Sequence, residues 1–202
     1  KTIGKQYLFT ALFMTCFAVT WSVLIRIQIA WPTAVHPFFS TLFPGLYESG
    51  VLLPERYLSL VTMHGTLMVF FVVSLALVSG FGNFIIPLQI GARDMAYPVL
   101  NMLSYWTVVP GCVLMLASFF VPDGAAAAGW TAYPPLSSKA TMNLTPLGST
   151  LWVVSVALEF VAFLLGGINF ITTSMNARAP GIKMMDIPIV VWMIVVASIL
   201  FM

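Results

Sequence analysis

Seven side chains in this sequence could do chemistry, and all of them lie in or beside long apolar runs. They are Arg26, His64, Asn83, Asp94, Asn101, Glu159 and Asn169. An ionisable group inside hydrocarbon is costly, so such residues within apolar runs are candidates for function. Imidazole binds metals and exchanges protons, carboxyl groups exchange protons, and amides hydrogen-bond to water.

The region around His64 has two interpretations. Its flanking residues are apolar or small, and Gly65 would let a flat group or another helix approach closely. A neutral imidazole could bind haem iron through one nitrogen while its other N–H donates to an acceptor. A histidine that only hydrogen-bonds to a neighbouring helix explains the same pattern equally well. A single histidine does not by itself define a metal site. Arg26 has two interpretations. It is either a cation directed at a buried carbonyl or propionate group, or a residue at the end of its span whose side chain snorkels to the interface. The sequence alone favours snorkelling.

The remaining polar groups indicate a proton path. Asp94 lies in a short loop, and Asn83, Asn101 and Asn169 lie near the same ends of three apolar runs. A carboxylate that collects protons with amides behind it predicts proton entry. Alternatively, each asparagine only hydrogen-bonds across a helix interface. Glu159, near the middle of the fourth run, is either a proton relay or a hydrogen-bonded structural acid.

The composition requires a membrane. The 202 residues are 60% hydrophobic and 7% charged, with a mean hydropathy of +1.02, whereas globular chains are about 45–50% apolar and about 25% charged. This excludes a cytosolic enzyme, a secreted disulfide scaffold and a disordered protein. The net charge of +2 is too small to indicate nucleic-acid binding. Cys16 and Cys112 each lie in an apolar run, and we expect both to be small buried hydrophobes.

The apolar runs predict an all-α, polytopic transmembrane helix bundle. Five spans are expected, at about residues 7–31, 57–88, 97–121 and 147–174, and from about 187 onward. A span needs about 20 apolar residues, so the fifth is expected to be cut short. We therefore expect residues 1–202 to form one transmembrane domain, the N-terminal portion of a longer subunit.

The basic residues predict that the N-terminus lies inside. With that orientation the inner segments hold five positive charges and the outer loops hold two, in line with the positive-inside rule. The inner residues are Lys1, Lys5, Arg93, Arg178 and Lys183, and the outer ones are Arg56 and Lys139.

Several sequence stretches, in order along the chain, resemble subunit I of the haem–copper terminal oxidases. They are His64-Gly65-Thr66, Gly82-Asn83-Phe84, Pro87 to Pro98, Asn101 to Trp106, Gly129 to Leu136 and Gly167 to Phe170. The resemblance implies a twelve-helix subunit of which this chain covers about the first five helices. The family reduces O2 to water at a haem–copper centre and pumps protons.

The resemblance also implies roles for particular residues. His64 would be one of two axial ligands of a low-spin haem of a or b type, and Arg26 would contact the edge of that haem. Asp94 would be the entrance of the D proton pathway, with Asn83, Asn101 and Asn169 organising its water. The high-spin haem and copper B are expected on later helices, so no catalytic residue is assigned to this chain.

Three departures from the family pattern bear on function. Ala162 and Phe163 replace small hydroxyl residues of the pathway one turn from Glu159, so the middle of the path is built differently. Gln28 replaces a glutamate that binds a structural cation in some members. Arg56 and Ser59 occupy positions where quinol-oxidising members have His and Gln, which favours cytochrome c as the electron donor.

The sequence thus predicts part of a proton-pumping cytochrome c oxidase in an energy-transducing inner or plasma membrane. The expected partners are subunits II and III, cytochrome c and membrane lipid. Two alternatives stay open. One is a quinol oxidase of the same family, and the other is a cofactor-free proton-coupled transporter that uses Asp94, Glu159 and His64 as relay groups.

Overall fold

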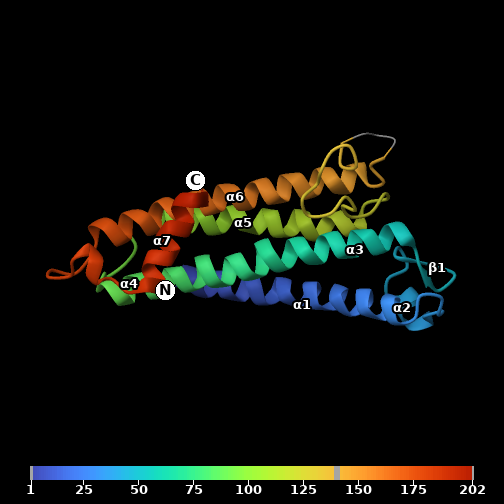
Figure 1. The fold of residues 1–202 in the computed structure, drawn as a ribbon, viewed down its shortest axis with the longest axis horizontal. Coiled ribbons are helices and arrows are strands. Elements are labelled where there is room, and N and C mark those ends of the chain that lie inside the picture. The colour runs from blue at the N-terminus through green and yellow to red at the C-terminus, as the bar shows by residue number, and fades with distance from the viewer. Residues whose placement is uncertain (1, 139–141, 202) are drawn as a thin grey trace. The chain divides into compact units, whose positions relative to one another are not determined.

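The chain is mainly helical (Figure 1). The computed structural model describes residues 2–138 and 142–201. Lys1 and Lys139, both counted in the charge distribution, lie outside these residues. Four helical segments of this described part are long and apolar enough to cross a membrane, and a shorter apolar helix follows them. The predicted all-α transmembrane bundle is therefore confirmed.

The helices match the expected spans, with shifted ends. The first is α1 (Thr2–Ala30), and the second comprises α3 (Pro54–Thr66), η1 (Leu67–Gly80) and α4 (Phe81–Ile90). The third comprises α5 (Pro98–Ala117) and the 3-10 turn η2 (Ser118–Phe120), the fourth is α6 (Pro146–Asn176), and the last is α7 (Ile189–Phe201). The turns of η1 are the wider turns of a π-helix, in which each N–H bonds five residues back.

Proline and glycine set several helix ends. Pro54, Pro98 and Pro146 each begin a helix, where the missing N–H costs nothing and the fixed φ fits. Gly91 ends α4 with a φ of 69°, in the left-handed region that glycine adopts without strain.

Short elements that the sequence pattern does not predict lie between α1 and α3. These are the helix α2 (Pro37–Leu42) and a hairpin of β1 (Tyr47–Glu48) and β2 (Val51–Leu52). A further 3-10 turn, η3 (Met184–Asp186), precedes α7.

The chain divides into two compact units. We call one the Asp94 unit, which contains Lys1–Phe13, Phe70–Gly111 and Val156–Met202, and the other the His64 unit, which contains Met14–Val69 and Cys112–Ser155. The boundaries fall within α1, η1, α5 and α6, so each unit contains parts of all four long spans.

In the Asp94 unit, α7 packs on α4 and α6 (Figure 1). Ile86 and Ile90 of α4 share an apolar core with Phe170 of α6 and with Val191 and Ile194 of α7. A glycine permits the close approach of α4 to α6, because a Cβ at Gly82 would lie 3.0 Å from the Phe170 ring.

In the His64 unit, polar and aromatic contacts join the spans to one another and to a loop. The indole Nε1 of Trp152 on α6 donates to Thr66 Oγ1 on α3 at 2.9 Å. Trp21 of α1 stacks on Phe119 of η2 with ring centroids 4.2 Å apart. Arg56 donates to the carbonyls of Asp123 and Pro122 at 2.6 and 3.2 Å, which ties the start of α3 to the loop after η2.

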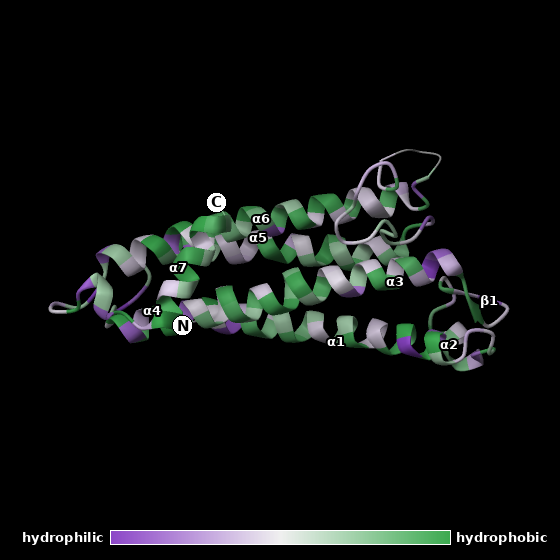
Figure 2. Ribbon diagram, in the orientation of Figure 1, coloured by the Kyte–Doolittle hydropathy of each residue, from purple (hydrophilic) through white to green (hydrophobic). Residues whose placement is uncertain are grey.

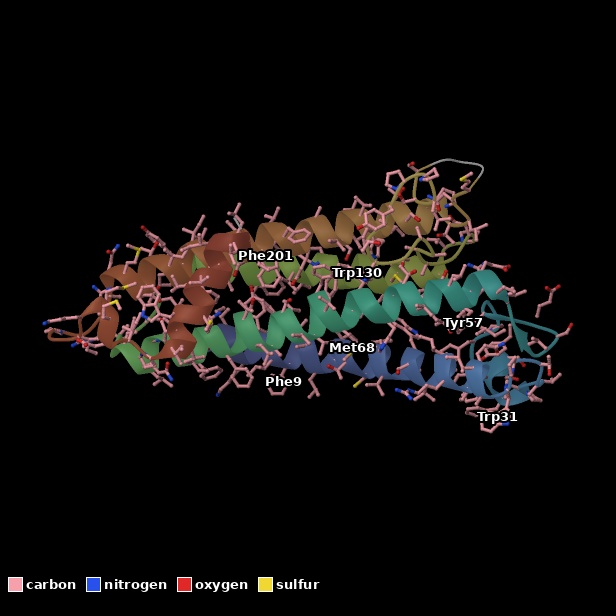
Figure 3. The ribbon with its side chains drawn as sticks, in the orientation of Figure 1. Phe9, Trp31, Tyr57, Met68, Trp130 and Phe201 are labelled. Carbon is pink, nitrogen blue, oxygen red and sulfur yellow. The ribbon has the colours of Figure 1, made fainter. Side chains whose placement is uncertain are left out.

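Hydrophobic residues predominate along the helices (Figure 2), and many large apolar side chains are exposed. Phe9 and Trp31 stand out from the ribbon in Figure 3 and are 71% and 59% exposed. Such surfaces suit lipid, which has no polar groups to offer in its hydrocarbon region. Cys112 is buried as expected, but Cys16 is exposed. The expectation for Cys16 was wrong because it lies on an outward face of α1.

Candidate functional site

His64 lies deeper along its helix than the sequence indicates. Because α3 begins at Pro54 rather than near Tyr57, His64 is the tenth residue after the helix start, about 15 Å along the axis at 1.5 Å per residue. The ring is half-buried. Its Nδ1 lies 2.9 Å from the backbone carbonyl oxygen of Ala18 on α1.

This contact determines which ring nitrogen can serve a ligand. The Ala18 carbonyl oxygen can only accept, so Nδ1 carries a proton, and in the neutral ring Nε2 keeps its lone pair. A backbone carbonyl on the other ring nitrogen is the usual outer contact of a metal-binding histidine. No group of three or more His, Cys, Asp or Glu that could hold a metal is found among the described residues. The donor set therefore fits one axial position of a haem and does not fit a protein-only metal site.

Gly65 follows His64 on α3 and leaves room for a small side chain. A Cβ placed on Gly65 would meet Trp130 Cδ1 at 3.9 Å, an ordinary van der Waals contact. Arg26 belongs to the same unit, and its side chain is exposed, which fits both a haem-edge contact and snorkelling. Gln28 Nε2 donates to the Pro32 carbonyl at 3.0 Å, so this amide forms a hydrogen bond with the backbone just after the C-terminus of α1.

The asparagines of the Asp94 unit differ in what they bind. Asn101 Nδ2 donates to Asn83 Oδ1 at 2.5 Å, and Asn83 Nδ2 donates to the Ser79 carbonyl at 2.8 Å. Both residues are buried. The direct bond between these two amides joins α5 to α4.

Asn169 instead holds backbone. Its Oδ1 accepts from the Tyr97 N–H at 2.9 Å, and its Nδ2 donates to the Tyr97 carbonyl at 3.1 Å. Thr173, one turn further along α6, accepts from the Ala96 N–H at 2.9 Å. Asn169 and Thr173 thus fix the segment that leads into α5. For Asn169 this matches the alternative in which the asparagine only forms hydrogen bonds across a helix interface.

Asp94 is exposed at the mouth of a small cavity. Its Oδ1 accepts from the Met95 N–H at 2.8 Å. A cavity of about 80 Å³ is lined by Asp94 and Asn83, together with Phe84, Pro87, Leu88, Ala92 and Arg93. Because a site of roughly 10–15 Å³ on this measure holds one water, the cavity has room for several between the carboxylate and the asparagine pair.

Glu159 is completely enclosed. Its exposed fraction is 0%, and neither carboxyl oxygen has a hydrogen-bond partner within residues 2–138 and 142–201. Ala162 and Phe163, on the following turn of α6, are also buried. A structural acid would be expected to have partners, so the contacts do not match that interpretation.

The sequence analysis missed one buried hydroxyl pair. The Tyr7 hydroxyl on α1 lies 2.8 Å from Ser104 Oγ on α5, and Ser104 Oγ also donates to the Asn101 carbonyl at 2.8 Å. The available signal was the position of Ser104 one turn after Asn101. Tyr7 gave no signal, because it stood at the expected start of the first span.

These features define a polytopic α-helical membrane protein with a half-buried histidine on its second span and a hydrogen-bonded pair of buried asparagines between α4 and α5. The sequence matches the family described as "Cytochrome C and Quinol oxidase polypeptide I" over residues 2–202. The chain belongs to this family, as its motifs predicted.

Curated relatives agree with this assignment. The chain is 36% identical to the "Alternative cytochrome c oxidase subunit 1" of Bradyrhizobium diazoefficiens, over 99% of this chain and 32% of the relative. It is 38% identical to the "Cytochrome c oxidase subunit 1" of Cereibacter sphaeroides, over 98% of this chain and 37% of the relative. It is also 38% identical to the protein of that name from Thermostichus vulcanus, over 99% and 32%. The chain thus spans about a third of the length of these relatives.

Proposed function

We propose that this chain is the low-spin-haem-binding and proton-uptake portion of a proton-pumping cytochrome c oxidase subunit I. The whole subunit would reduce O2 to water with electrons from cytochrome c. Residues 1–202 would form one transmembrane domain, and the high-spin haem and copper B would lie on helices outside this chain. The observation that carries the proposal is the His64 Nδ1 contact to the Ala18 carbonyl, which leaves Nε2 free.

His64 would hold the low-spin haem iron through Nε2, and Arg26 would contact the edge of the haem. When bound, the haem supplies one-electron transfer. The protein's part is to orient the imidazole: the Ala18 carbonyl accepts from Nδ1 and so fixes both the tautomer and the direction of the ring.

Proton uptake would begin at Asp94. The exposed carboxylate would collect protons from the inner aqueous side and pass them through the 80 Å³ cavity to the Asn83–Asn101 pair. Asn169 would support the path by holding the Tyr97 backbone. Subunits II and III would be the partners, in an energy-transducing inner or plasma membrane with the N-terminus inside.

Cytochrome c is favoured over quinol as the donor. The two positions that differ from quinol-oxidising members have structural contacts here: Arg56 donates to the carbonyls of Asp123 and Pro122, and Ser59 Oγ donates to the Ala125 carbonyl at 2.7 Å. They hold a loop at the start of α3.

The test is the optical spectrum of His64→Ala in the purified complex. We expect loss of the low-spin haem absorbance with retained membrane insertion, because an axial ligand is removed. His36→Ala is the matched control, since His36 is the other histidine of the chain and lies in a loop before α2. Unchanged low-spin absorbance in His64→Ala would refute the ligand assignment. A wild-type complex without haem would favour the cofactor-free proton-coupled transporter.

A further inference from the structure

A cavity of about 470 Å³ lies in the His64 unit, beside the start of α3. Its walls come from three spans of this chain, with Trp21 of α1, Arg56 of α3 and Phe119 of η2 among them, and from the loops after α2 and η2. Ligand pockets in proteins usually measure about 300–1,000 Å³. A membrane-spanning helix, about 30 Å long and 10 Å wide, is far too large for this space. The cavity therefore suits a small molecule or a single hydrocarbon chain.

The wall of the cavity is almost entirely apolar. Phe17 and Trp21 of α1 face it together with Phe119, and the Trp21 and Phe119 rings stack with centroids 4.2 Å apart. Apart from the Trp21 indole, the polar side chains among its described lining residues are Arg56 and Ser59. Ser59 Oγ already donates to the Ala125 carbonyl. Because no carboxyl or imidazole group of the described residues lines the cavity, it offers no base to a reacting ligand. A ligand that binds here without reacting fits this lining.

Arg56 places an unneutralised positive charge at this apolar wall. Its guanidinium donates to backbone carbonyls of the loop after η2, which are neutral and leave the charge in place. The Asp123 carboxylate is bound elsewhere, because its Oδ2 accepts from the Leu147 N–H at 2.7 Å at the start of α6. Glu55 precedes Arg56 in α3, but consecutive residues of a helix do not face each other. Gly124 packs directly on the guanidinium, since a Cβ there would overlap Arg56 Nη1, so the cation is held in a fixed position.

We propose that this cavity binds one acyl chain of an anionic phospholipid, with the lipid phosphate beside Arg56. The acyl chain would lie against the Trp21–Phe119 pair, where it removes apolar surface from water. The planar guanidinium matches the oxygens of a phosphate group, and basic pockets between membrane helices bind anionic headgroups. Arg56 is the third residue of α3, which places it near the membrane boundary, at the level of lipid headgroups. The proposal depends on neither the haem nor the proton path.

The test is lipid retention by the complete oxidase complex. Native mass spectrometry would count the lipids that remain after washing in detergent micelles containing either phosphatidylglycerol or phosphatidylcholine. The wild-type complex should retain one phosphatidylglycerol that Arg56→Gln binds about 10-fold more weakly, because a charge-assisted contact is lost. Leu116→Trp should lose the same lipid, since Leu116 lines the cavity and the larger side chain fills it while Arg56 stays. Lys183→Gln is the matched control, because it removes an exposed cation from the other unit.

The outcomes decide both parts of the proposal. Loss of the lipid in Arg56→Gln and Leu116→Trp, with wild-type retention in Lys183→Gln, supports it. Equal retention in all of these proteins, or loss in Arg56→Gln alone, would overturn binding in the cavity. Equal retention of phosphatidylcholine and phosphatidylglycerol by the wild-type complex would overturn the pairing of an anionic headgroup with Arg56. An isoprenoid quinone that is retained in place of phospholipid and is lost in Leu116→Trp would overturn the lipid assignment and favour the quinol oxidase alternative.

Discussion

At the residue scale, similar side chains have different environments. Asn83 and Asn101 bond to each other, and Asn83 lines the cavity beside Asp94. The Asn169 amide instead forms both of its hydrogen bonds with the Tyr97 backbone. The three amides are therefore not equivalent members of a path. An asparagine that binds backbone contributes mainly to stability, and one that adjoins a cavity is available to order water.

Asn169→Ala is therefore expected to destabilise the protein. It removes two hydrogen bonds to the Tyr97 backbone, each with a net contribution of about 0.5–1.5 kcal/mol, so the free energy of unfolding should fall by roughly 1–3 kcal/mol. Denaturant titration of the detergent-solubilised protein measures it. Thr172→Ala is the control, because the exposed Thr172 hydroxyl donates only to the Ile168 carbonyl of its own helix. Equal stability of the two variants would contradict the backbone-holding role.

At the element scale, the second span positions both candidate sites. Its segment α3 carries His64, and its segment α4 carries Asn83, with the wider turns of η1 between them. Charge and hydropathy in the sequence mark this run as one long span. They do not reveal the change of helix type, which depends on how side chains pack against neighbouring helices.

Gly82→Ala is expected to strain the packing of α4 on α6. The new Cβ would lie 3.0 to 3.4 Å from three atoms of the Phe170 ring, and overpacking of this kind typically costs about 1–3 kcal/mol. Thermal denaturation should show a lower midpoint for this variant. Gly166→Ala is the matched control on α6, since the nearest atom to its Cβ is Ser104 Oγ at 4.0 Å and alanine favours helix. A midpoint as high in Gly82→Ala as in Gly166→Ala would exclude a tight α4–α6 contact.

At the scale of the whole molecule, the charge distribution predicts the orientation of the chain in the membrane. Among the described residues, Lys5, Arg93, Arg178 and Lys183 lie in segments proposed to be inside, and Arg56 lies in a segment proposed to be outside. Because positive residues near span ends are retained inside, this distribution favours an inside N-terminus. The same orientation places Asp94 on the side from which protons would be taken up.

Cysteine labelling measures this orientation. In a background with Cys16→Ala and Cys112→Ala, Lys183→Cys should react with a membrane-impermeant thiol reagent only from the inside. Glu48→Cys, in β1, should react only from the outside. The reverse pattern would invert the topology and remove Asp94 from the proton-uptake side.

The sequence alone determined the class of the protein, the positions of its spans and its family, because these depend on hydropathy, chain length and motifs that are local in the chain. It also predicted His64, Asp94 and Glu159 as candidate site residues, since ionisable groups stand out against apolar surroundings. Only the tertiary structure decided which groups are partners: the Ala18 carbonyl at His64, the Tyr97 backbone at Asn169, and Tyr7 at Ser104. These contacts join residues far apart in sequence, and their pairing depends on which helix faces meet, which no periodicity encodes.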